Sequence, residues 1–244
     1  MKRYLYLLTI MCVSLSCDDK VIDTGDVLTN LTISQQEIHA DGQSTVEVTV
    51  ELDKNASSDR RSVVFSTSSG TFLPKDSVKA TVKAEFFDGK LIATTKLRAP
   101  VRPGTITVTA KPEYDIPSQD FILEGSLTAT LSVPAQIRLN PSGFAITANF
   151  GSQVALTATL RNSDGKFVSA GYKVVFEDLL GAGGPAGGRF NHLKDVTTDS
   201  SVTAASYSAP KLPIGTDIMI KATVLDNAGA KTGITDFVIL TINQ

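Results

Sequence analysis

The chain has 244 residues, of which 20% are charged and 42% are hydrophobic, and its formal net charge is −2. This composition is that of an ordinary globular protein and excludes collagen, coiled coil and wholesale disorder. A near-neutral chain gives no electrostatic reason to expect nucleic acid as a partner. Two Cys and two His are too few for a zinc ribbon or a disulfide-built scaffold.

The N-terminal segment has the order of a secretory signal. Lys2 and Arg3 precede a mainly apolar stretch from Leu5 to Leu15. That stretch is too short to span a bilayer, but it has the length of the apolar region of a signal peptide. We therefore expect residues 1–16 to be removed and leave them out of the fold.

The run Val13-Ser14-Leu15-Ser16-Cys17 resembles a bacterial lipobox, although Leu15 stands two residues before the Cys where the pattern has three. The resemblance implies cleavage before Cys17 and acylation of its thiol and new amine, which would anchor the protein in a membrane. A plain secretory signal cleaved near Ser16 is the alternative. Because Cys12 leaves with the signal, no intramolecular disulfide is expected.

Residues 17–27 form an acidic tether, and its charged residues are Asp18, Asp19, Lys20, Asp23 and Asp26. An acidic stretch directly after a lipidated Cys resembles the surface-export signals of some Gram-negative lipoproteins. The resemblance implies an outer-membrane protein that faces outward. A solvated spacer, with the protein on the periplasmic face, is the alternative.

The rest of the chain has the period-2 pattern of strands with one buried face. Apolar residues alternate with polar ones over 46–52, 105–109, 154–160 and 218–224. Val and Thr dominate these runs, as is typical of half-buried strands. Turn sequences such as Asp88-Gly89 and Ser163-Asp164-Gly165 separate them. No helical pattern is longer than a turn or two.

A repeat relates the two halves of the chain. Val46–Leu52 aligns with Val154–Leu160, and further matches join Val63-Val64-Phe65 to Val174-Val175-Phe176 and Ala99-Pro100 to Ala209-Pro210. We predict two domains, 28–133 and 134–244, each an antiparallel sandwich of about seven strands. Pro134 lies at the joint, and so short a linker favours a stiff rod.

Specific runs resemble bacterial immunoglobulin-like (Ig-like) domains of the invasin/intimin type, group 1. They are Ala40-Asp41-Gly42-Gln43-Ser44-Thr45-Val46, Val64–Phe72, Asn162–Phe176, Thr198–Ala204 and Ala209-Pro210. The first repeat departs by carrying Asn55-Ala56-Ser57-Ser58 where an Asp-Gly turn is expected. The resemblance implies an all-β protein of two tandem Ig-like sandwiches that serves as a surface spacer or adhesion module. A fold alone does not transfer a ligand.

Catalytic and metal-binding patterns are missing from the sequence, so we expect no enzyme, no cofactor and no metal. His39 and His192 lie in different domains, and no Gly-x-Ser-x-Gly sequence is present. His39 is most simply an exposed turn residue. Asp164 and Asp226-Asn227 belong to turns and lack the converging oxygen ligands that calcium needs.

The glycine-rich run Gly181–Gly188 is the best candidate for a contact loop. It lacks the Gly-Lys-Ser/Thr and the helix of a phosphate site, because Arg189-Phe190 follows it. We interpret it as a loop between strands, and loops at the ends of sandwiches often carry binding. The candidate contact residues are Gly183, Gly184, Pro185 and Arg189.

Three functions fit these patterns. The leading hypothesis is a lipid-anchored, non-enzymatic adhesion or interaction module whose ligand is a protein or a glycan. The second is a structural subunit of an envelope complex, joined through edge strands. The third is a glycan-binding accessory of a polysaccharide-uptake system. Against it stands the absence of Trp, which leaves Tyr114, Tyr172 and Tyr207 as the Tyr of residues 17–244.

Overall fold

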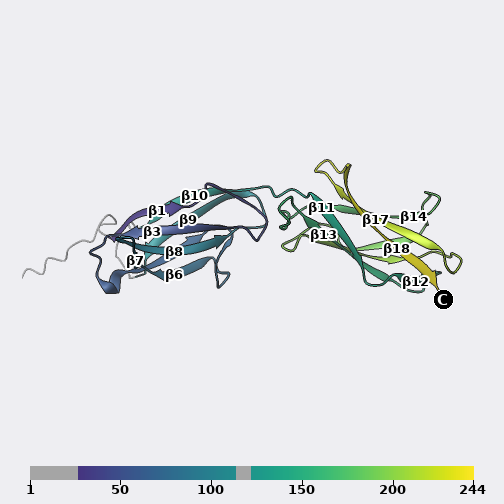
Figure 1. Ribbon diagram of the computed structural model, residues 1–244, viewed down its shortest axis with the longest axis horizontal. Coiled ribbons are helices and arrows are strands. Elements are labelled where there is room, and N and C mark those ends of the chain that lie inside the picture. The colour runs from purple at the N-terminus through teal and green to yellow at the C-terminus, as the bar shows by residue number, and fades with distance from the viewer. Residues whose placement is uncertain (1–26, 114–121) are drawn as a thin grey trace, which may run out of the picture.

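The computed structural model describes residues 27–113 and 122–244, so the signal, Cys17, the tether before Val27 and Tyr114 lie outside the described residues. Two β-sandwiches follow each other along the long axis (Figure 1). Each has its own hydrophobic core, drawn from residues 27–129 and 139–242. This confirms the predicted all-β fold of two tandem Ig-like sandwiches. No helix in the described ranges is long and apolar enough to span a bilayer.

The first domain is a pair of sheets. One sheet contains β1 (Leu28–Ile33), β3 (Thr45–Leu52), β8 (Lys90–Arg98) and β5 (Thr71–Phe72), with β7 (Glu85–Phe87) also paired to β8. The other contains β2 (Glu37–His39), β10 (Leu123–Thr130), β9 (Gly104–Pro112), β4 (Ser62–Thr67) and β6 (Lys79–Lys83). A 3-10 turn, η1 (Ser58–Arg60), occupies the place where the sequence lacks the Asp-Gly turn.

The second domain repeats this plan with fewer short strands. One sheet has the order β11 (Gln136–Pro141), β13 (Val154–Arg161), β16 (Val202–Ser208) and β15 (Arg189–Lys194). The other has the order β12 (Ala145–Thr147), β18 (Lys231–Asn243), β17 (Asp217–Leu225) and β14 (Val174–Leu180).

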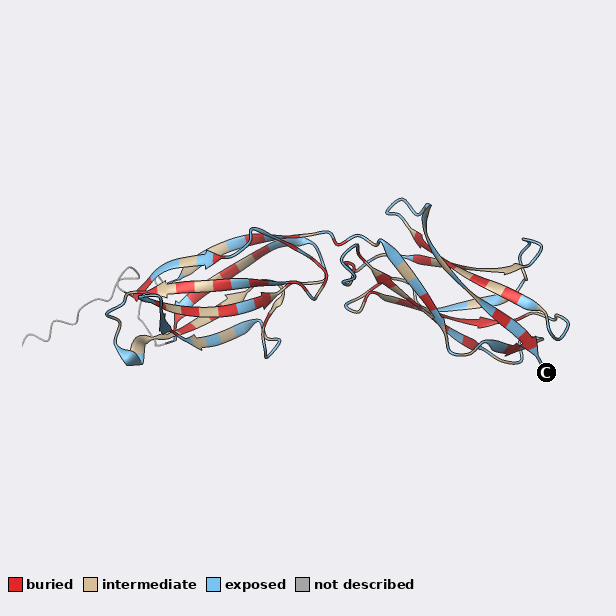
Figure 2. Cartoon of the chain, in the orientation of Figure 1, coloured by how far each residue is buried: buried red, intermediate tan, exposed pale blue. Residues whose placement is uncertain are grey.

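The predicted alternation is borne out along the central strands, as the banding in Figure 2 shows. Every second residue of β3, β13 and β17 is an apolar residue buried in a core, and the residues between are more exposed, except for Thr223 of β17, which is also buried. Phe65 and Phe176 are buried in the two cores. Burial of one such side chain stabilises the fold by about 1.5–3 kcal/mol, so these rows supply most of the stability of each sandwich.

One strand pair in each domain departs from the predicted antiparallel pattern. β2 pairs with β10 in parallel, and β12 pairs with β18 in parallel. Both are three-residue strands that follow the first long strand of their domain after a short crossing to the opposite sheet. Such short segments carry too little periodicity for their direction to be predicted.

The sequence repeat is a structural repeat, because β3 and β13 occupy equivalent positions, as do β4 and β14. Equivalent ends of the two domains can therefore be compared. The joint end of the first domain is formed by residues 40–44 and 99–103. The tip of the second domain is formed by the equivalent residues 148–152 and 209–216 together with the loop 181–189. The tip lies at the end of the molecule that carries the C-terminus (Figure 1).

Candidate functional site

The predicted contact loop lies at the tip. It connects β14 to β15, and the last residue of β14, Leu180, pairs with Ile218 at the start of β17. The neighbouring tip loops are joined by a hydrogen bond from the Phe150 amide to the Ala209 carbonyl at 2.8 Å. Gly183, Gly184, Pro185 and Arg189 are all exposed. The structure thus brings the four candidate contact residues together with two further loops.

The loop is tied to the sandwich by one carboxylate. Asp178 Oδ2 accepts hydrogen bonds from the Gly188 amide at 2.6 Å and from the Tyr207 hydroxyl at 2.9 Å. A Cβ on Gly188 would lie 2.3 Å from the Tyr207 ring, so this position requires glycine. Within the loop, the Leu180 amide donates to the Gly184 carbonyl and the Gly183 amide to the Leu180 carbonyl, both at 2.8 Å. The glycine run is therefore a hydrogen-bonded turn.

Tyr207 lies buried beneath this loop. Its side chain is fully buried, and its ring packs against Phe190 with 4.8 Å between ring centroids. Burial, followed by the hydrogen bond to Asp178 and the negative charge of that group, raises the pKa of the Tyr207 hydroxyl far above its ordinary value. Tyr207 therefore acts as a neutral hydrogen-bond donor that positions the loop.

The exposed centre of the tip is an aromatic–arginine pair. The guanidinium of Arg189 lies 4.5 Å from the centroid of the Phe150 ring, a cation–π contact. Phe150 and its neighbour Asn149 have φ of 59° and 61°. This left-handed region is unfavourable for a bulky side chain and is concentrated at functional sites in proteins. In this conformation the Phe150 side chain is 39% exposed at the surface of the tip.

The equivalent end of the first domain has a different role, because it is packed against the second domain. The Ser169 hydroxyl donates to the Ala40 carbonyl at 2.8 Å, and the Ala170 amide donates to the Val101 carbonyl at 2.8 Å. Ser132, which precedes the linker, is hydrogen-bonded in both directions with Ser169 and is buried. The joint is thus a built interface.

Asp41 organises the joint end. Its carboxylate accepts hydrogen bonds from the amides of Gln43 and Ser44 at 2.8 and 2.6 Å and from the Ser44 hydroxyl at 2.6 Å. Asp41 is fully buried, and Lys166 of the second domain donates to the same Ser44 hydroxyl at 2.9 Å. Gln43 accepts from the Phe167 amide at 3.0 Å. The loop after β2 is thereby fixed to the loop after β13.

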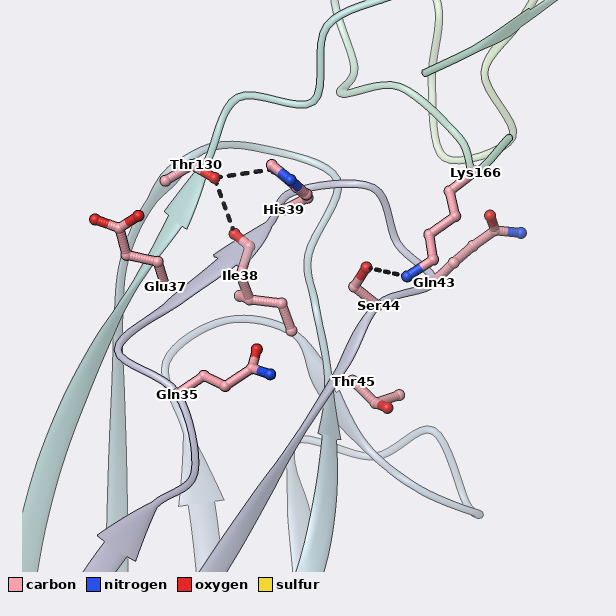
Figure 3. Close-up of a pocket in the computed structure, with 9 residues that line it drawn as sticks. All are labelled: Gln35, Glu37, Ile38, His39, Gln43, Ser44, Thr45, Thr130 and Lys166. Atoms are coloured by element: carbon pink, nitrogen blue, oxygen red, sulfur yellow. Dashed lines mark hydrogen bonds between the residues drawn. The ribbon is translucent and has the colours of Figure 1, made fainter. Parts of the chain in front are cut away.

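A polar cleft of about 500 Å³ lies beside the joint (Figure 3). Its walls are Gln35, Glu37, Ile38, His39, Gln43, Ser44, Thr45, Thr130 and, from the second domain, Lys166. His39 shares a hydrogen bond with Thr130 at 3.2 Å. The amides, hydroxyls and one ammonium of these walls can hydrogen-bond a polar ligand.

The two histidines lie far apart in the structure. His39 is exposed as expected, but it belongs to β2 and not to a turn. His192 is exposed on β15, where its Nδ1 lies 3.7 Å from Asp195. Asp226 caps its own turn through hydrogen bonds from the amides of Ala228 and Ala230. Among residues 27–113 and 122–244, no group of three or more His, Cys, Asp or Glu side chains could hold a metal ion.

Comparison with solved structures identifies the fold. The chain is similar to invasin, described as a bacterial integrin-binding protein, with 19% identity and a TM-score of 0.57 over 87% of this chain and 38% of invasin. Both domains have the invasin-type Ig-like fold. Weaker matches are the Yersinia pseudotuberculosis adhesin InvE (16% identity, TM-score 0.44, 90% of this chain and 61% of InvE) and the D0-D1 domain of intimin (17%, 0.33, 89% and 99%).

This likeness shows the fold alone, since identity is below 20% in each case. The chain spans 38% of the invasin structure and 61% of the InvE structure. No protein-family model and no curated protein matches the sequence. The site of this invasin-type chain must therefore be argued from its own residues.

Sequence reasoning missed Phe150, Asp178 and Tyr207, which complete the tip. Only the repeat could have revealed Phe150, because the alignment of Val46 with Val154 places Phe150 opposite Gly42. Asp178 and Tyr207 carry no pattern of their own, and they meet because β14 and β16 lie in opposite sheets of one invasin-type sandwich.

Proposed function

We propose that the chain is a lipid-anchored, non-enzymatic cell-envelope protein whose two domains form a short rod that presents the tip as an adhesion or interaction surface. Acylated Cys17 would attach the N-terminal end to the outer membrane, with the rod facing outward. The observation that carries the proposal is a difference in residues between the two equivalent ends, the joint end of the first domain and the tip of the second. The joint end has Gly42 at the place where the tip has the strained, exposed Phe150 stacked on Arg189.

Steric fit supports the difference in role. A Cβ on Gly42 would lie 2.8 Å from the Val101 side chain and 3.8 Å from the backbone carbonyl of Asp199 in the second domain. A phenylalanine at that position would clash with the Val101 side chain of its own domain and would extend toward the second domain, so the residue found at the tip does not fit the joint. The tip instead offers a ring, a cation and glycine-loop backbone groups, which are common components of protein-binding surfaces.

The joint supports a rod that keeps its two ends apart. It is held by hydrogen bonds from both flanking loops and from the linker, and its Ser132, Asn162 and Ser169 are buried. Relative domain motion is the default where interfaces are small and exposed. A buried and hydrogen-bonded joint reduces that freedom, so the anchor and the contact surface stay at opposite ends.

Protease accessibility on intact cells tests the location. An epitope tag inserted in the exposed Asp226–Ala230 turn leaves the tip residues unchanged, and a periplasmic protein serves as the leakage control. The proposal predicts loss of the tag while the control survives, together with a Cys17→Ser variant that is released from membranes. Protection of the tag until the outer membrane is broken would overturn the surface role and point to a periplasmic complex.

A further inference from the structure

The hairpin formed by β7 and β8 exposes two consecutive phenylalanines. Phe86 is 56% exposed and Phe87 is 71% exposed, although both lie in a strand. The two turn residues, Asp88 and Gly89, both have positive φ, of 46° and 75°. This is the geometry of a tight two-residue hairpin turn, so the aromatic pair is held on a defined support. Consecutive strand residues point to opposite faces, so the two rings flank the hairpin beside its turn. Exposed aromatic rings at such a projecting turn indicate an interaction surface.

Strand register places this hairpin at the end of the molecule opposite the tip. Phe86 pairs with Leu91 of β8, Leu91 pairs with Leu52 of β3, and Leu52 pairs with Leu28 of β1. The hairpin therefore lies level with the first residue of the first strand, and its turn points away from the joint. Figure 1 shows β7 at that end of the first domain.

The same end is the one that the proposed lipid anchor holds. Cys17 precedes Leu28 by eleven residues. Even a fully extended segment of that length reaches only about 40 Å. This step rests on the proposed function, because acylation of Cys17 is part of it. Such a short tether gives any membrane-binding group on this end a high effective concentration at the bilayer.

The surroundings of the two rings suit the boundary between lipid headgroups and acyl chains. The Arg61 guanidinium lies 5.2 Å from the centroid of the Phe86 ring and is oriented by a hydrogen bond from its Nε to the Ala56 carbonyl at 3.0 Å. Lys90 lies directly across the strand pair from Phe87, and its ammonium forms an ion pair with Glu51 of β3 at 2.8 Å. Long basic side chains can hold their charge at headgroup level while rings insert beneath. Glu85 and Asp88 are in the same hairpin, so its overall charge is near neutral.

We propose that the β7–β8 hairpin is a membrane-contact surface that inserts Phe86 and Phe87 into the leaflet holding the lipid anchor. The occupant is the lipid bilayer itself. Because the hairpin carries both signs of charge, apolar insertion supplies the attraction and anionic lipid is not required. The contact gives the rod a second attachment point beside the anchor, so the first domain sits on the bilayer and the tip is directed away from it.

The test uses two features of the chain: it has no Trp, and Cys17 is the one cysteine of residues 17–244. The described core of the first domain begins at Val27, so a chain of residues 17–244 contains the whole described fold. Cys17 is coupled to a maleimide-headgroup lipid in phosphatidylethanolamine–phosphatidylglycerol vesicles, which reproduces the tether. The Phe87→Trp variant then carries the sole indole reporter. Phe144→Trp is the matched control, because Phe144 is 67% exposed and lies beside β18 in the second domain.

The proposal predicts that the indole emission of the Phe87→Trp variant moves to shorter wavelength on the vesicles and is quenched by lipids brominated in their acyl chains. The emission of the Phe144→Trp variant should stay at its value in solution. Adding Phe86→Ser to Phe87→Trp should reduce the shift, and circular dichroism would verify that the fold is retained. Replacing phosphatidylglycerol by phosphatidylcholine, or raising the salt concentration, should leave the shift in place.

An unchanged spectrum of the Phe87→Trp variant on protein-free vesicles would overturn the proposal. Equal shifts for the indoles at positions 87 and 144 would overturn it as non-specific adsorption. An emission shift that disappears at high salt would overturn apolar insertion, because it would indicate that electrostatic attraction holds the hairpin at the bilayer. The assay supplies its own tether, so its failure is distinguishable from failure of natural acylation or of surface exposure.

Discussion

The joint end and the tip are equivalent places in one repeated fold, yet one is a packed interface and the other a surface. Ala40-Asp41-Gly42-Gln43-Ser44 aligns with Ala148-Asn149-Phe150-Gly151-Ser152. At the joint, a buried carboxylate caps two amides, and Gly42 leaves room for the Val101 side chain beside the second domain. At the tip, Phe150 occupies the position equivalent to Gly42, with its backbone in the left-handed region. The comparison shows one repeated turn with two different sets of residues: a buried carboxylate cap and a glycine where it packs against the second domain, and an exposed phenylalanine at the tip.

Transferring the tip residue into the joint should have the largest effect. Gly42→Phe places a bulky side chain in the left-handed region, which costs about 1–3 kcal/mol, and overpacks the joint, which costs roughly 1–3 kcal/mol more. We expect a lower urea midpoint for the first domain. Small-angle scattering should show a broader distribution of domain orientations. Unchanged scattering and stability would contradict a close-packed joint.

Removing the buried Asp41 carboxylate should have the second-largest effect on stability. Asp41→Ala leaves the amides of Gln43 and Ser44 without their acceptor, and we expect a loss of about 2–4 kcal/mol in the free energy of unfolding. The matched control is Asp226→Ala, which removes the same kind of cap from an exposed turn and should cost less than about 1 kcal/mol because water replaces the carboxylate. Equal losses in the free energy of unfolding for the two variants in urea titrations would show that burial at the joint does not strengthen the contribution of the Asp41 carboxylate.

Within the tip, Tyr207→Phe should destabilise the second domain by about 1 kcal/mol, since one hydrogen bond to Asp178 is lost. The pH dependence gives a sharper readout. The pKa of Tyr207 is raised in the folded state, so its contribution is fully present below pH 10, the ordinary tyrosine value, and is lost as the unfolded chain ionises at higher pH. Urea midpoints above pH 10 should fall more steeply for the wild type than for the variant, and parallel profiles would contradict the buried donor.

The reverse exchange, Phe150→Gly, should have the smallest effect on stability. It removes the left-handed strain and also the stacking with Arg189, and each contributes on the order of 1 kcal/mol with opposite sign. We expect the free energy of unfolding to change by less than about 1 kcal/mol in thermal or urea titrations. A loss of several kcal/mol would make Phe150 a packed structural residue and not a surface group.

The sequence predicted what periodicity and repetition can carry. Alternation located β3, β13 and β17, and the glycine run located the loop between β14 and β15. Periodicity could not predict the side-chain contacts, because they join residues far apart in the chain. Arg189 meets Phe150, and Ser169 meets Ala40, only after the sandwiches have formed. The parallel pairing of β2 with β10 and of β12 with β18 was also not predicted, since strands of three residues show no periodicity.

The most direct test of the central claim is adherence through the tip. Chains of residues 17–244 are coupled to beads through Cys17, which leaves the tip facing outward, and bound beads are counted on intact bacterial and animal cells. Arg189→Ala and Phe150→Gly are compared with Phe237→Ala, a control on an exposed face of the second domain. We predict that wild-type and control beads adhere and that both tip variants lose most of that adherence. Adherence that survives both tip changes would contradict the claim that the tip is the contact surface.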